Sequence, residues 1–333
     1  MKIPLKEAQK MAENILSGVG FSLASAQIVA ANLIEANLVG KSTHGIKSLL
    51  TIVKLVESKA INLDDDLAII SESKSHLFCD GKNRSGYVVV NQAIERVLSR
   101  NDLAGISMIG IKDMAYATGY VGAYAKKVTD AGLIFLGFTK SPGGLVPYGA
   151  IDALFGTNPI TFGAPVDQGS VILDMASSEI TWSELLEAVE KKETLRKGIA
   201  LDKNGSVTQN PTEAIHGGLL PIAGHKGSGL ALIAEILIGS LLGSNQNANI
   251  KDNPTWGAFF VIISPQTFVP LGQYKDRIEE LLGKLKKARK SREVDEIYYP
   301  GERSQIVKKQ ILEKEFLEIE DQVITNLKMI IAK

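Results

Sequence analysis

Helical periodicity at both ends of the chain, with strand-length apolar runs between them, restricts the fold more than any other sequence feature. Apolar residues at three- and four-residue steps predict helices over residues 4–56, 304–318 and 321–332. The middle of the chain is expected to alternate between further helices and short strands. Those helices are 86–100, 118–130 and 227–243, and the strands are 67–70, 76–79, 106–111, 133–139, 160–164, 171–174 and 259–263.

This order of elements predicts an α+β fold in which the two ends pack together as one helical layer. We expect residues 1–70 and 303–333 to form a helical domain, and residues 71–302 to form a sheet-containing domain. A Rossmann fold is not supported, because no Gly-x-Gly-x-x-Gly follows a strand. The nearest match, Gly18-Val-Gly20, is followed by Leu23 and lies between helical patterns.

The composition excludes several classes of partner. Thirty-seven basic residues balance thirty-seven acidic ones, so the chain has no net charge that would attract nucleic acid or a membrane surface. Its one cysteine, Cys79, excludes an internal disulfide and a cysteine-rich zinc site, and no metal is expected. The first residues lack the apolar core of a signal peptide, and no apolar run is long enough to cross a bilayer. We therefore expect a cytoplasmic protein.

Residues 25–38 predict an amphipathic helix with clear signals at both ends. Ser22 or Ser25 can cap its start, and Gly40 suits the position just past its end. The expected apolar stripe consists of Ile28, Ala31, Ile34 and Leu38.

A small-residue turn, Gly40-Lys41-Ser42-Thr43-His44-Gly45, follows this helix and presents one histidine. A histidine at such a place can reach a ligand, and its ordinary pKa of ~6.5 allows proton transfer at neutral pH. A solvent-exposed histidine with no catalytic role is an equally good interpretation of this hexapeptide alone. A phosphate loop is excluded, because the glycine it needs five positions before Gly40 is Glu35.

Four glycine-rich or small-residue segments follow expected strands and could bring backbone N–H groups to a phosphate. Each alone is more often a structural turn. Lys226, just before an expected helix, is the best single candidate for a phosphate or ribose contact. Asp174 ends a strand that reads as buried, so its carboxylate needs a partner, and a histidine is a plausible one. The segments are 156–159, 174–178, 224–229 and 300–303.

Taken in order, these motifs resemble the malate/L-lactate dehydrogenase family, which is unrelated to the Rossmann-type lactate and malate enzymes. The family includes ureidoglycolate, sulfolactate, diketogulonate and cyclic-imine reductases. The resemblance runs from about residue 4 to the C-terminus. It rests on Ser42-Thr43-His44-Gly45, Asp80-Gly81 with Gly86, Pro147-Tyr148-Gly149, Gly156-Thr157-Asn158-Pro159, Asp174-Met175-Ala176-Ser177-Ser178, Leu220-Pro221, Gly224-His225-Lys226-Gly227 and Pro300-Gly301-Glu302.

The resemblance implies a homodimeric reductase of a small-molecule substrate that uses NAD or NADP. The terminal helices would form one domain, and a largely antiparallel sheet would carry the cofactor. His44 would be the proton donor, and Asp174 would orient its imidazole and favour the charged form. The implied cofactor-binding residues are Thr157, Asn158, Asp174, Met175, Ala176, Ser178, His225, Lys226, Gly301 and Glu302.

Two departures from the family pattern fall on the substrate side. The arginine that usually follows the catalytic histidine by four residues is Ser48 here. The family's Asn-Ser-Asn-His-Phe-Gly segment is also missing, and Met114 stands where its histidine is expected. Lys47 and Lys112 are the alternative anchors for a substrate carboxylate.

Two hypotheses follow from this pattern. The first is an active NAD(P)H-dependent reductase acting on a 2-oxo acid/2-hydroxy acid pair or on a cyclic imino acid. The second is a cofactor-binding paralogue with little or no turnover, in a structural or regulatory role. The pairing of His44 with Asp174 favours the enzyme, and the loss of the arginine at position 48 favours the paralogue.

Overall fold

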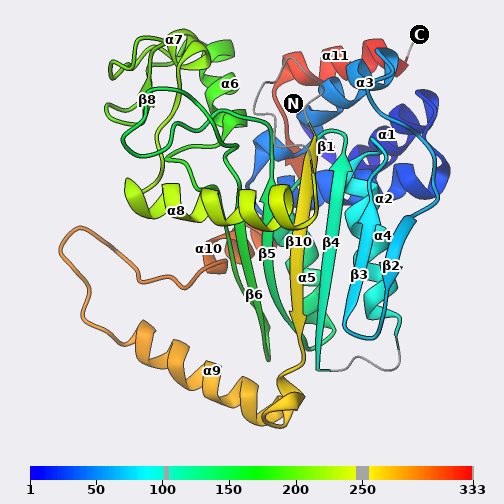
Figure 1. Cartoon of the computed structure of the whole chain (residues 1–333), viewed down its shortest axis with the longest axis vertical. Helices are drawn as coiled ribbons and strands as arrows, with labels where there is room; N and C mark the ends of the chain where they lie inside the picture. The colour runs from blue at the N-terminus through cyan, green and yellow to red at the C-terminus, as the bar shows by residue number, and fades with distance from the viewer. Residues whose placement is uncertain (101–104, 245–254, 332–333) are drawn as a thin grey trace.

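A seven-stranded sheet forms the centre of the computed structural model, which describes residues 1–100, 105–244 and 255–331 (Figure 1). Neighbouring strands run antiparallel except β3 and β4, which are parallel. The predicted α+β class with a largely antiparallel sheet is therefore confirmed. In spatial order the strands are β2 (Ala68–Glu72), β3 (His76–Asp80), β4 (Ile106–Met114), β10 (Trp256–Ile263), β5 (Ile134–Lys140), β6 (Ile160–Val166) and β7 (Gly169–Met175).

Helices cover the two faces of this sheet unequally. The helices α4 (Gly86–Leu98) and α5 (Val121–Asp130) lie against one face, where residues such as Phe135 and Phe260 are fully buried. On the other face α8 (His225–Ala234), continued by a π-helix over Glu235–Leu241, crosses only one end of the strands (Figure 1). The predicted single helix over residues 227–243 is thus two helical segments of different pitch.

The two ends of the chain pack together, as predicted. Strand β1 (Lys2–Pro4) pairs antiparallel with β11 (Phe316–Glu318), with Ile3 opposite Leu317. Residues 316–318 were expected to continue a helix, and this expectation is wrong because the pairing with β1 extends them. The boundaries at residues 70/71 and 302/303 stay a prediction. The helices of this layer are α1 (Leu5–Gly18), α2 (Leu23–Leu38), α3 (Leu49–Glu57), α10 (Glu302–Lys314) and α11 (Asp321–Ile331).

Helix α2 confirms both of its predicted end signals. The Ser22 hydroxyl accepts a hydrogen bond from the Ser25 N–H at 3.1 Å, and Gly40 adopts a positive φ of +80° just past the end. The predicted apolar stripe is only partly right, because Ala31 is exposed. The face that is completely buried runs along Ala26, Val29, Ala30 and Leu33.

A further group of elements lies beside α8 and includes two helices that the sequence analysis did not predict. Another helix, α9, extends away from the sheet after β10 (Figure 1). None of the described helices is long and apolar enough to cross a membrane. The remaining elements are α6 (Trp182–Lys191), α7 (Pro211–His216), β8 (Ala200–Leu201), β9 (Gly218–Leu219), α9 (Leu271–Lys286) and three 3₁₀ turns, Ser42–His44, Ile46–Ser48 and Pro265–Thr267.

Candidate functional site

His44 lies in a 3₁₀ turn that is fixed from both sides. Its Nδ1 atom lies 3.1 Å from the Thr43 hydroxyl oxygen, and its side chain is half-buried. The Asn37 side chain in α2 accepts a hydrogen bond from the Ile46 N–H at 2.7 Å. A Cβ at Gly45 would come within 2.1 Å of Asn37 Oδ1, so only glycine allows this close approach. The turn is therefore held against α2, and with it the position of the imidazole.

Asp174 lies at the end of β7 and has two hydrogen-bond donors. One carboxylate oxygen accepts from the Gly122 N–H at 2.8 Å, in the first turn of α5, and the other accepts from the Thr161 hydroxyl at 2.9 Å. Burial raises the pKa of Asp174, and these hydrogen bonds and the charge of His44 act in the opposite direction. The carboxylate was expected to have a partner, with a histidine as the candidate. In the structure it has two hydrogen-bond donors, the Gly122 N–H at the start of α5 and the Thr161 hydroxyl, and it interacts with His44 through charge.

Two carboxylates and one ammonium group act on His44. Burial lowers the pKa of His44, Asp174 and Glu184 counteract the shift, and Lys41 adds to it. The described side chains of His44 and Asp174 interact through charge without a direct hydrogen bond, because the imidazole contacts Thr43 and the carboxylate contacts Gly122 and Thr161. Asp174 therefore does not set the ring orientation through a bond of its own.

Glu184 is a residue that the sequence analysis missed. It stands at the third position of α6, where its side chain accepts from the Thr181 N–H at 2.6 Å. The Thr181 hydroxyl accepts in return from the Glu184 N–H at 3.1 Å, which completes a capping box. The Thr-x-x-Glu pattern at 181–184 was the available signal, since it predicts a helix start with a fixed glutamate.

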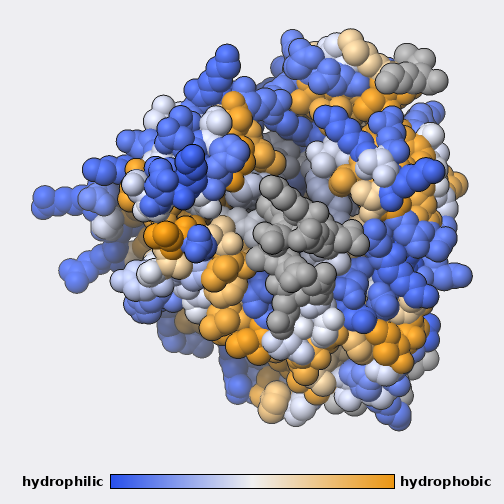
Figure 2. All heavy atoms as spheres, turned by 45° about the horizontal axis from the view of Figure 1, so that its top comes forward, coloured by the Kyte–Doolittle hydropathy of each residue, from blue (hydrophilic) through white to orange (hydrophobic). Residues whose placement is uncertain are grey.

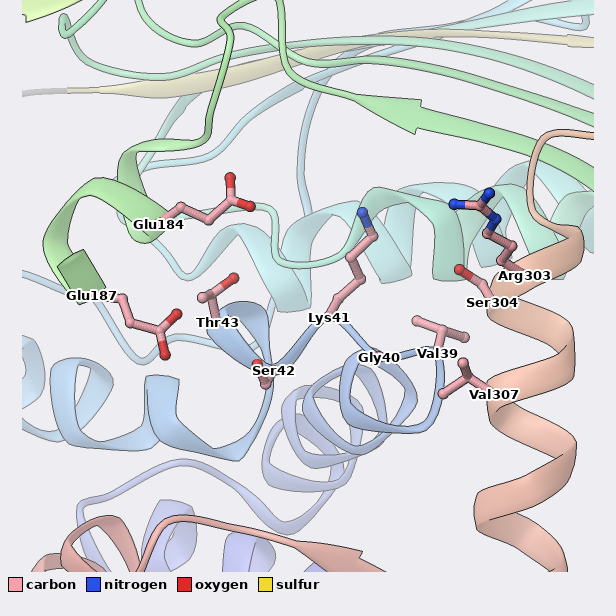
Figure 3. Close-up of a pocket in the computed structure, with 10 residues that line it drawn as sticks. All are labelled: Val39, Gly40, Lys41, Ser42, Thr43, Glu184, Glu187, Arg303, Ser304 and Val307. Carbon is pink, nitrogen blue, oxygen red and sulfur yellow. The ribbon is translucent and has the colours of Figure 1, made fainter. Parts of the chain in front are cut away.

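A cavity of about 400 Å³ adjoins the histidine turn (Figure 3). Lys41 comes from the turn after α2, Arg303 from the start of α10, and both side chains extend into the same space. Glu184 and Glu187 enter from α6 on the other side. The cavity is lined by Val39, Gly40, Lys41, Ser42, Thr43, Glu184, Glu187, Arg303, Ser304 and Val307.

The carboxylates of this cavity are engaged by neighbouring groups, whereas its two cations are open to a ligand. Glu187 is paired with Lys191 at 2.6 Å, and Glu184 is engaged in the α6 capping box. Within the described ranges no carboxylate lies at ion-pair distance from Lys41 or Arg303, and the Arg303 guanidinium lies over the Tyr298 ring at 4.6 Å. Two cations are thus available to an anionic group that enters from solvent.

The strand-end segments predicted to bind a cofactor are joined to one another. Ser177 connects them, since its N–H donates to the Thr157 carbonyl at 2.8 Å and its carbonyl accepts from the Ile222 N–H at 2.9 Å. Ser178 is buried and forms a bridge with Pro221. The structure therefore brings residues 157–158, residues 174–178 and the loop that leads into α8 together at one end of strands β6 and β7.

The side chains in these segments differ in how free they are. Asn158 is completely buried, and its amide donates to the Ala231 carbonyl at 3.2 Å and to Glu235 at 2.8 Å. His225 is exposed, with its ring 6.0 Å from that of Tyr148, and Lys226 is exposed in the first turn of α8. Asn158 thus braces the strand-end turn internally, whereas Lys226 faces solvent. Met175 and Ala176 are half-buried.

The loop before α10 runs beside β7. The Pro300 carbonyl accepts from the Ile172 N–H at 3.0 Å, and a Cβ on Gly301 would lie 2.9 Å from the Ile172 carbonyl oxygen. Glu302 accepts from Lys286 at 2.8 Å and from the Tyr299 N–H at 3.1 Å. Gly301 and Glu302 therefore hold the loop two residues from Asp174, and the neighbouring Arg303 is the side chain that reaches the cavity.

The predicted substrate anchors differ in their distance from the histidine turn, which only Ser48 contacts, because its hydroxyl donates to the Thr43 carbonyl at 3.4 Å. Lys47 is paired with Glu190 in α6 at 2.6 Å, and Lys112 is paired with its neighbour Asp113 at 3.6 Å. Ser48 is 8% exposed and lies against the buried phenols of Tyr87 and Tyr116.

None of the residues 47, 48 and 112 lines the cavity. Met114 is completely buried in the core of the sheet. Among the described residues, no three histidine, cysteine, aspartate or glutamate side chains form a group that could hold a metal ion.

Comparison with known proteins gives a consistent result over the whole chain. Residues 3–328 match the family described as malate/L-lactate dehydrogenase. A malate dehydrogenase of Pyrococcus abyssi is 31% identical over 315 residues, which cover 91% of this chain and 87% of the relative. The ureidoglycolate dehydrogenase (NAD(+)) of Escherichia coli O157:H7 is 26% identical over 97% of this chain and 94% of its own. The structure of sulfolactate dehydrogenase from Methanocaldococcus jannaschii superposes with a TM-score of 0.87 at 28% identity, over 99% of this chain and 96% of that chain.

Proposed function

Because the chain belongs to the malate/L-lactate dehydrogenase family, we propose that it is an NADH- or NADPH-dependent reductase. Its substrate is a 2-oxo acid, interconverted with the 2-hydroxy acid, or a cyclic imino acid. The observation that carries this proposal is His44 in a fixed turn, under the charge of Asp174 and Glu184 and beside a cavity with two available cations. A proton donor next to an anion-binding cavity is what reduction of a carbonyl or imine requires.

The residues around the cavity fit a nicotinamide cofactor. When bound, the nicotinamide ring supplies the hydride for the reaction. Its phosphates are anionic, and Lys41 and Arg303 offer one point charge and one planar fork for such groups. The N-terminus of α10, of which Arg303 and Ser304 are first-turn residues, adds the positive end of a 13-residue helix. Gly301 and Glu302 hold this helix start against β7. Lys226 is a further exposed cation, and it follows the loop that is bonded to the end of β7.

His44 is proposed to give its proton from Nε2. The Thr43 hydroxyl contacts Nδ1, which leaves Nε2 for the substrate oxygen or nitrogen. Burial makes the imidazolium a stronger acid by lowering its pKa, and Asp174 and Glu184 keep the charged form accessible. As negative charge grows on the substrate oxygen, His44 protonates it, and the carboxylates stabilise the positive charge that His44 carries before transfer.

The substrate side departs from the arrangement that the family resemblance implies. A clamp for a small carboxylate is missing at position 48, because Ser48 is buried against two tyrosines. Lys47 is bound to Glu190. We propose that pyruvate and oxaloacetate are poor substrates, and that the physiological substrate holds its anionic group elsewhere. The same observation is the one that favours the alternative function, a cofactor-binding paralogue with little turnover.

The remaining parts of the proposal concern assembly and organisation. The reductase is a homodimer that works in the cytoplasm on a small molecule, with neither nucleic acid nor membrane as partner. Residues 1–70 and 303–333 form the helical domain that carries His44, and residues 71–302 form the sheet domain. Thr157, Met175, Ala176, Ser178 and His225 shape the cofactor site through the backbone and side chains of the joined segments.

A reductase screen with both cofactors tests the proposal. Oxidation of NADH or NADPH is measured with 2-oxo acids, cyclic imino acids and larger keto compounds as candidate substrates. Binding of each cofactor is measured by the tryptophan fluorescence of Trp182 and Trp256. Saturable binding with turnover of one compound class supports the enzyme. Saturable binding with no turnover of any class supports the paralogue, and no binding of either cofactor at millimolar concentration contradicts both.

A further inference from the structure

His44 and Asp174 come from different parts of the chain, and their described side chains have no hydrogen bond to each other. His44 follows α2 in the helical layer, whereas Asp174 lies at the end of β7 in the sheet. His44 contacts Thr43, and Asp174 is bonded to Gly122 and Thr161. The charge that Asp174 exerts on His44 therefore depends on other contacts that join the two parts of the chain.

Asn32, in the middle of α2, joins this helix to the start of α5. Its side-chain N–H donates to the Tyr120 carbonyl at 3.2 Å, and its side-chain oxygen accepts from the Tyr120 N–H at 3.1 Å. Both hydrogen bonds go to the main chain of one residue, which is the N-cap of α5. Two bonds from one planar amide fix both the position and the direction of this segment.

The loop that receives these bonds is held from two sides. A Cβ at Gly119, where φ is +73°, would lie 2.5 Å from the Asn32 side-chain oxygen and 2.2 Å from the Tyr87 ring. Only glycine allows this close approach. On the other side, the Tyr124 hydroxyl donates to the Thr118 carbonyl at 2.9 Å. The start of α5 is therefore fixed between α2 and its own first turns.

Asn32 is a polar residue at a buried position. Hydrophilic side chains cover much of the molecular surface in Figure 2, but Asn32 is only 6% exposed, and its helix neighbours Val29 and Leu33 are completely buried. Asparagine is a poorer helix former than leucine, and a buried amide is costly unless it is hydrogen-bonded. An apolar residue is expected at such a position unless the two hydrogen bonds to Tyr120 are needed.

The apolar contact between α2 and the start of α5 is small. It consists of Ala36, Val39 and the Tyr120 ring, with Ala123 packed against them. Apolar contacts have no directionality, so a cluster of this size allows the two elements to shift past each other. The relative position of α2 and α5 therefore depends on the hydrogen bonds of Asn32.

Helix α2 holds the histidine turn through a second asparagine. The Asn37 side chain accepts from the Ile46 N–H at 2.7 Å, and Ile46 stands two residues after His44. Asn32 and Asn37 are five residues apart, which is about 7.5 Å along a helix axis. Because both amides stand on one short stretch of helix, their separation is fixed.

The connection from Asn32 to Asp174 is equally short. Tyr120 stands two residues before Gly122, and the Gly122 N–H donates to the Asp174 carboxylate at 2.8 Å. A displacement of Tyr120 therefore moves the N–H group that holds this carboxylate. The imidazole and the carboxylate are thus both positioned from α2, each through a different asparagine.

We propose that Asn32 is a positioning residue for proton transfer, which sets the separation of His44 and Asp174 by joining α2 to the start of α5. The inference rests on the proposed function, in which His44 gives the proton. Asn32 does not line the cavity, so it acts through the other two residues. The charged groups that act on His44 are Asp174, Lys41 and Glu184, and of these only Asp174 is bonded to α5.

NMR titration of the imidazole tests the inference without turnover. The chain has four histidines, and the signal that is absent from His44→Ala identifies His44. Asn32→Leu removes both hydrogen bonds at nearly equal volume, so the start of α5 and the Asp174 carboxylate move away from the imidazole. Since the charge of Asp174 raises the pKa of His44, we expect this variant to lower that pKa by roughly 0.3–0.5 pH unit.

Steady-state kinetics on the best substrate of the screen give a second measurement. We expect Asn32→Leu to lower kcat by about 10- to 10²-fold, because a shift of ~1 Å in a reacting geometry has an effect of this size. Cofactor affinity should stay near that of the wild type. The fall in kcat/KM should move to lower pH by the same amount as the pKa of His44.

Thr129→Val is the matched control. Thr129 is 3% exposed at the other end of α5, where its hydroxyl shares a hydrogen bond with that of Ser170 at 2.6 Å. Its loss should lower the melting temperature and leave the pKa of His44 and kcat unchanged. Asn32→Ala is the milder variant if leucine unfolds the protein, since water can then bond to the freed main-chain groups of Tyr120. Circular dichroism shows which variants are folded.

The outcomes distinguish this inference from the proposed function. A folded Asn32 variant in which His44 keeps its wild-type pKa would overturn the inference, and so would an equal shift in Thr129→Val. If no compound of the screen is reduced, the proposed function fails, while a lowered pKa of His44 in the Asn32 variants still supports the positioning role. If the wild type is active and Asn32→Leu keeps its kcat and pH profile, only the positioning role fails.

Discussion

The hydroxyl oxygen of Thr43 lies 3.1 Å from Nδ1 of His44, and this contact between neighbours in one 3₁₀ turn decides which ring nitrogen is available. With Nδ1 engaged, Nε2 is the nitrogen that can face a ligand. Asp174 and Glu184 act on the same ring only through charge. Orientation and charge of the imidazole therefore depend on different residues, and they can be tested separately.

Replacement of His44 tests its role as the proton donor. We expect His44→Ala to lower kcat by about 10²- to 10⁴-fold, which is the usual contribution of a positioned general acid, with cofactor affinity near that of the wild type. His76→Ala, at the start of β3 and hydrogen-bonded to Ser73, is the control and should retain activity. Full activity of His44→Ala on the best substrate of the screen would show that the histidine is structural.

The pH dependence of reduction separates the charges around His44. Reduction needs the protonated imidazole, so kcat/KM should fall as pH rises through a pKa that lies below the ordinary value of 6.5. Glu184→Gln removes a charge that raises this pKa, so the fall in kcat/KM should move to lower pH, while glutamine keeps the capping box. Lys41→Ala removes a charge that lowers the pKa of His44, so the fall in kcat/KM should move to higher pH. Shifts of both variants in one direction would contradict this assignment.

The two cavity cations are expected to bind cofactor phosphate. Lys41→Ala and Arg303→Ala should each raise the cofactor Kd about 10- to 100-fold, since charge-assisted hydrogen bonds contribute about 1.5–3 kcal/mol. Lys309→Ala, exposed on the same helix α10, is the control. Equal losses for NADH and NADPH would assign the cations to the diphosphate, and a loss for NADPH alone would assign them to the 2′-phosphate. Unchanged affinity for both cofactors would remove Lys41 and Arg303 from the site.

Restoring an arginine at position 48 is expected to cost stability. Ser48 is 8% exposed and contacts the phenols of Tyr87 and Tyr116, so Ser48→Arg should lower the free energy of unfolding by about 1–3 kcal/mol through overpacking. Lys47→Ala breaks only an ion pair with a 59% exposed glutamate, and should change the free energy of unfolding by less than about 1 kcal/mol. Denaturant unfolding measures both. A Ser48→Arg protein of wild-type stability that reduces pyruvate well would show that the pocket has room for the clamp.

The sequence predicted those parts of the fold that depend on local signals. The Ser22 cap, the Gly40 stop and the position of Asp174 at a strand end follow from residue type and spacing, and the structure contains all three. The strand at 316–318 was missed because its conformation depends on pairing with β1, more than 300 residues away. Local periodicity carries no information on such a partner.

The candidate site was predictable only in part, for a similar reason. His44 and Asp174 each stand beside a recognisable turn or strand end. Glu184 and Arg303 reach the same region from α6 and α10, and their approach depends on how three distant elements pack. The ion pair between Lys47 and Glu190 likewise engages a candidate anchor through a residue 143 positions away. A spacing rule cannot supply contacts of this kind.

The pairing of Ile3 with Leu317 also has a consequence for how the protein is made. On the ribosome the N-terminal helices emerge first, but their last partners, β11 and α11, are synthesised at the other end of the chain. The layer that carries His44 cannot close before those residues appear, so the first segment must wait in an incomplete state while the sheet folds. Premature termination near residue 315 would leave the sheet's sequence whole and the histidine turn without its finished support.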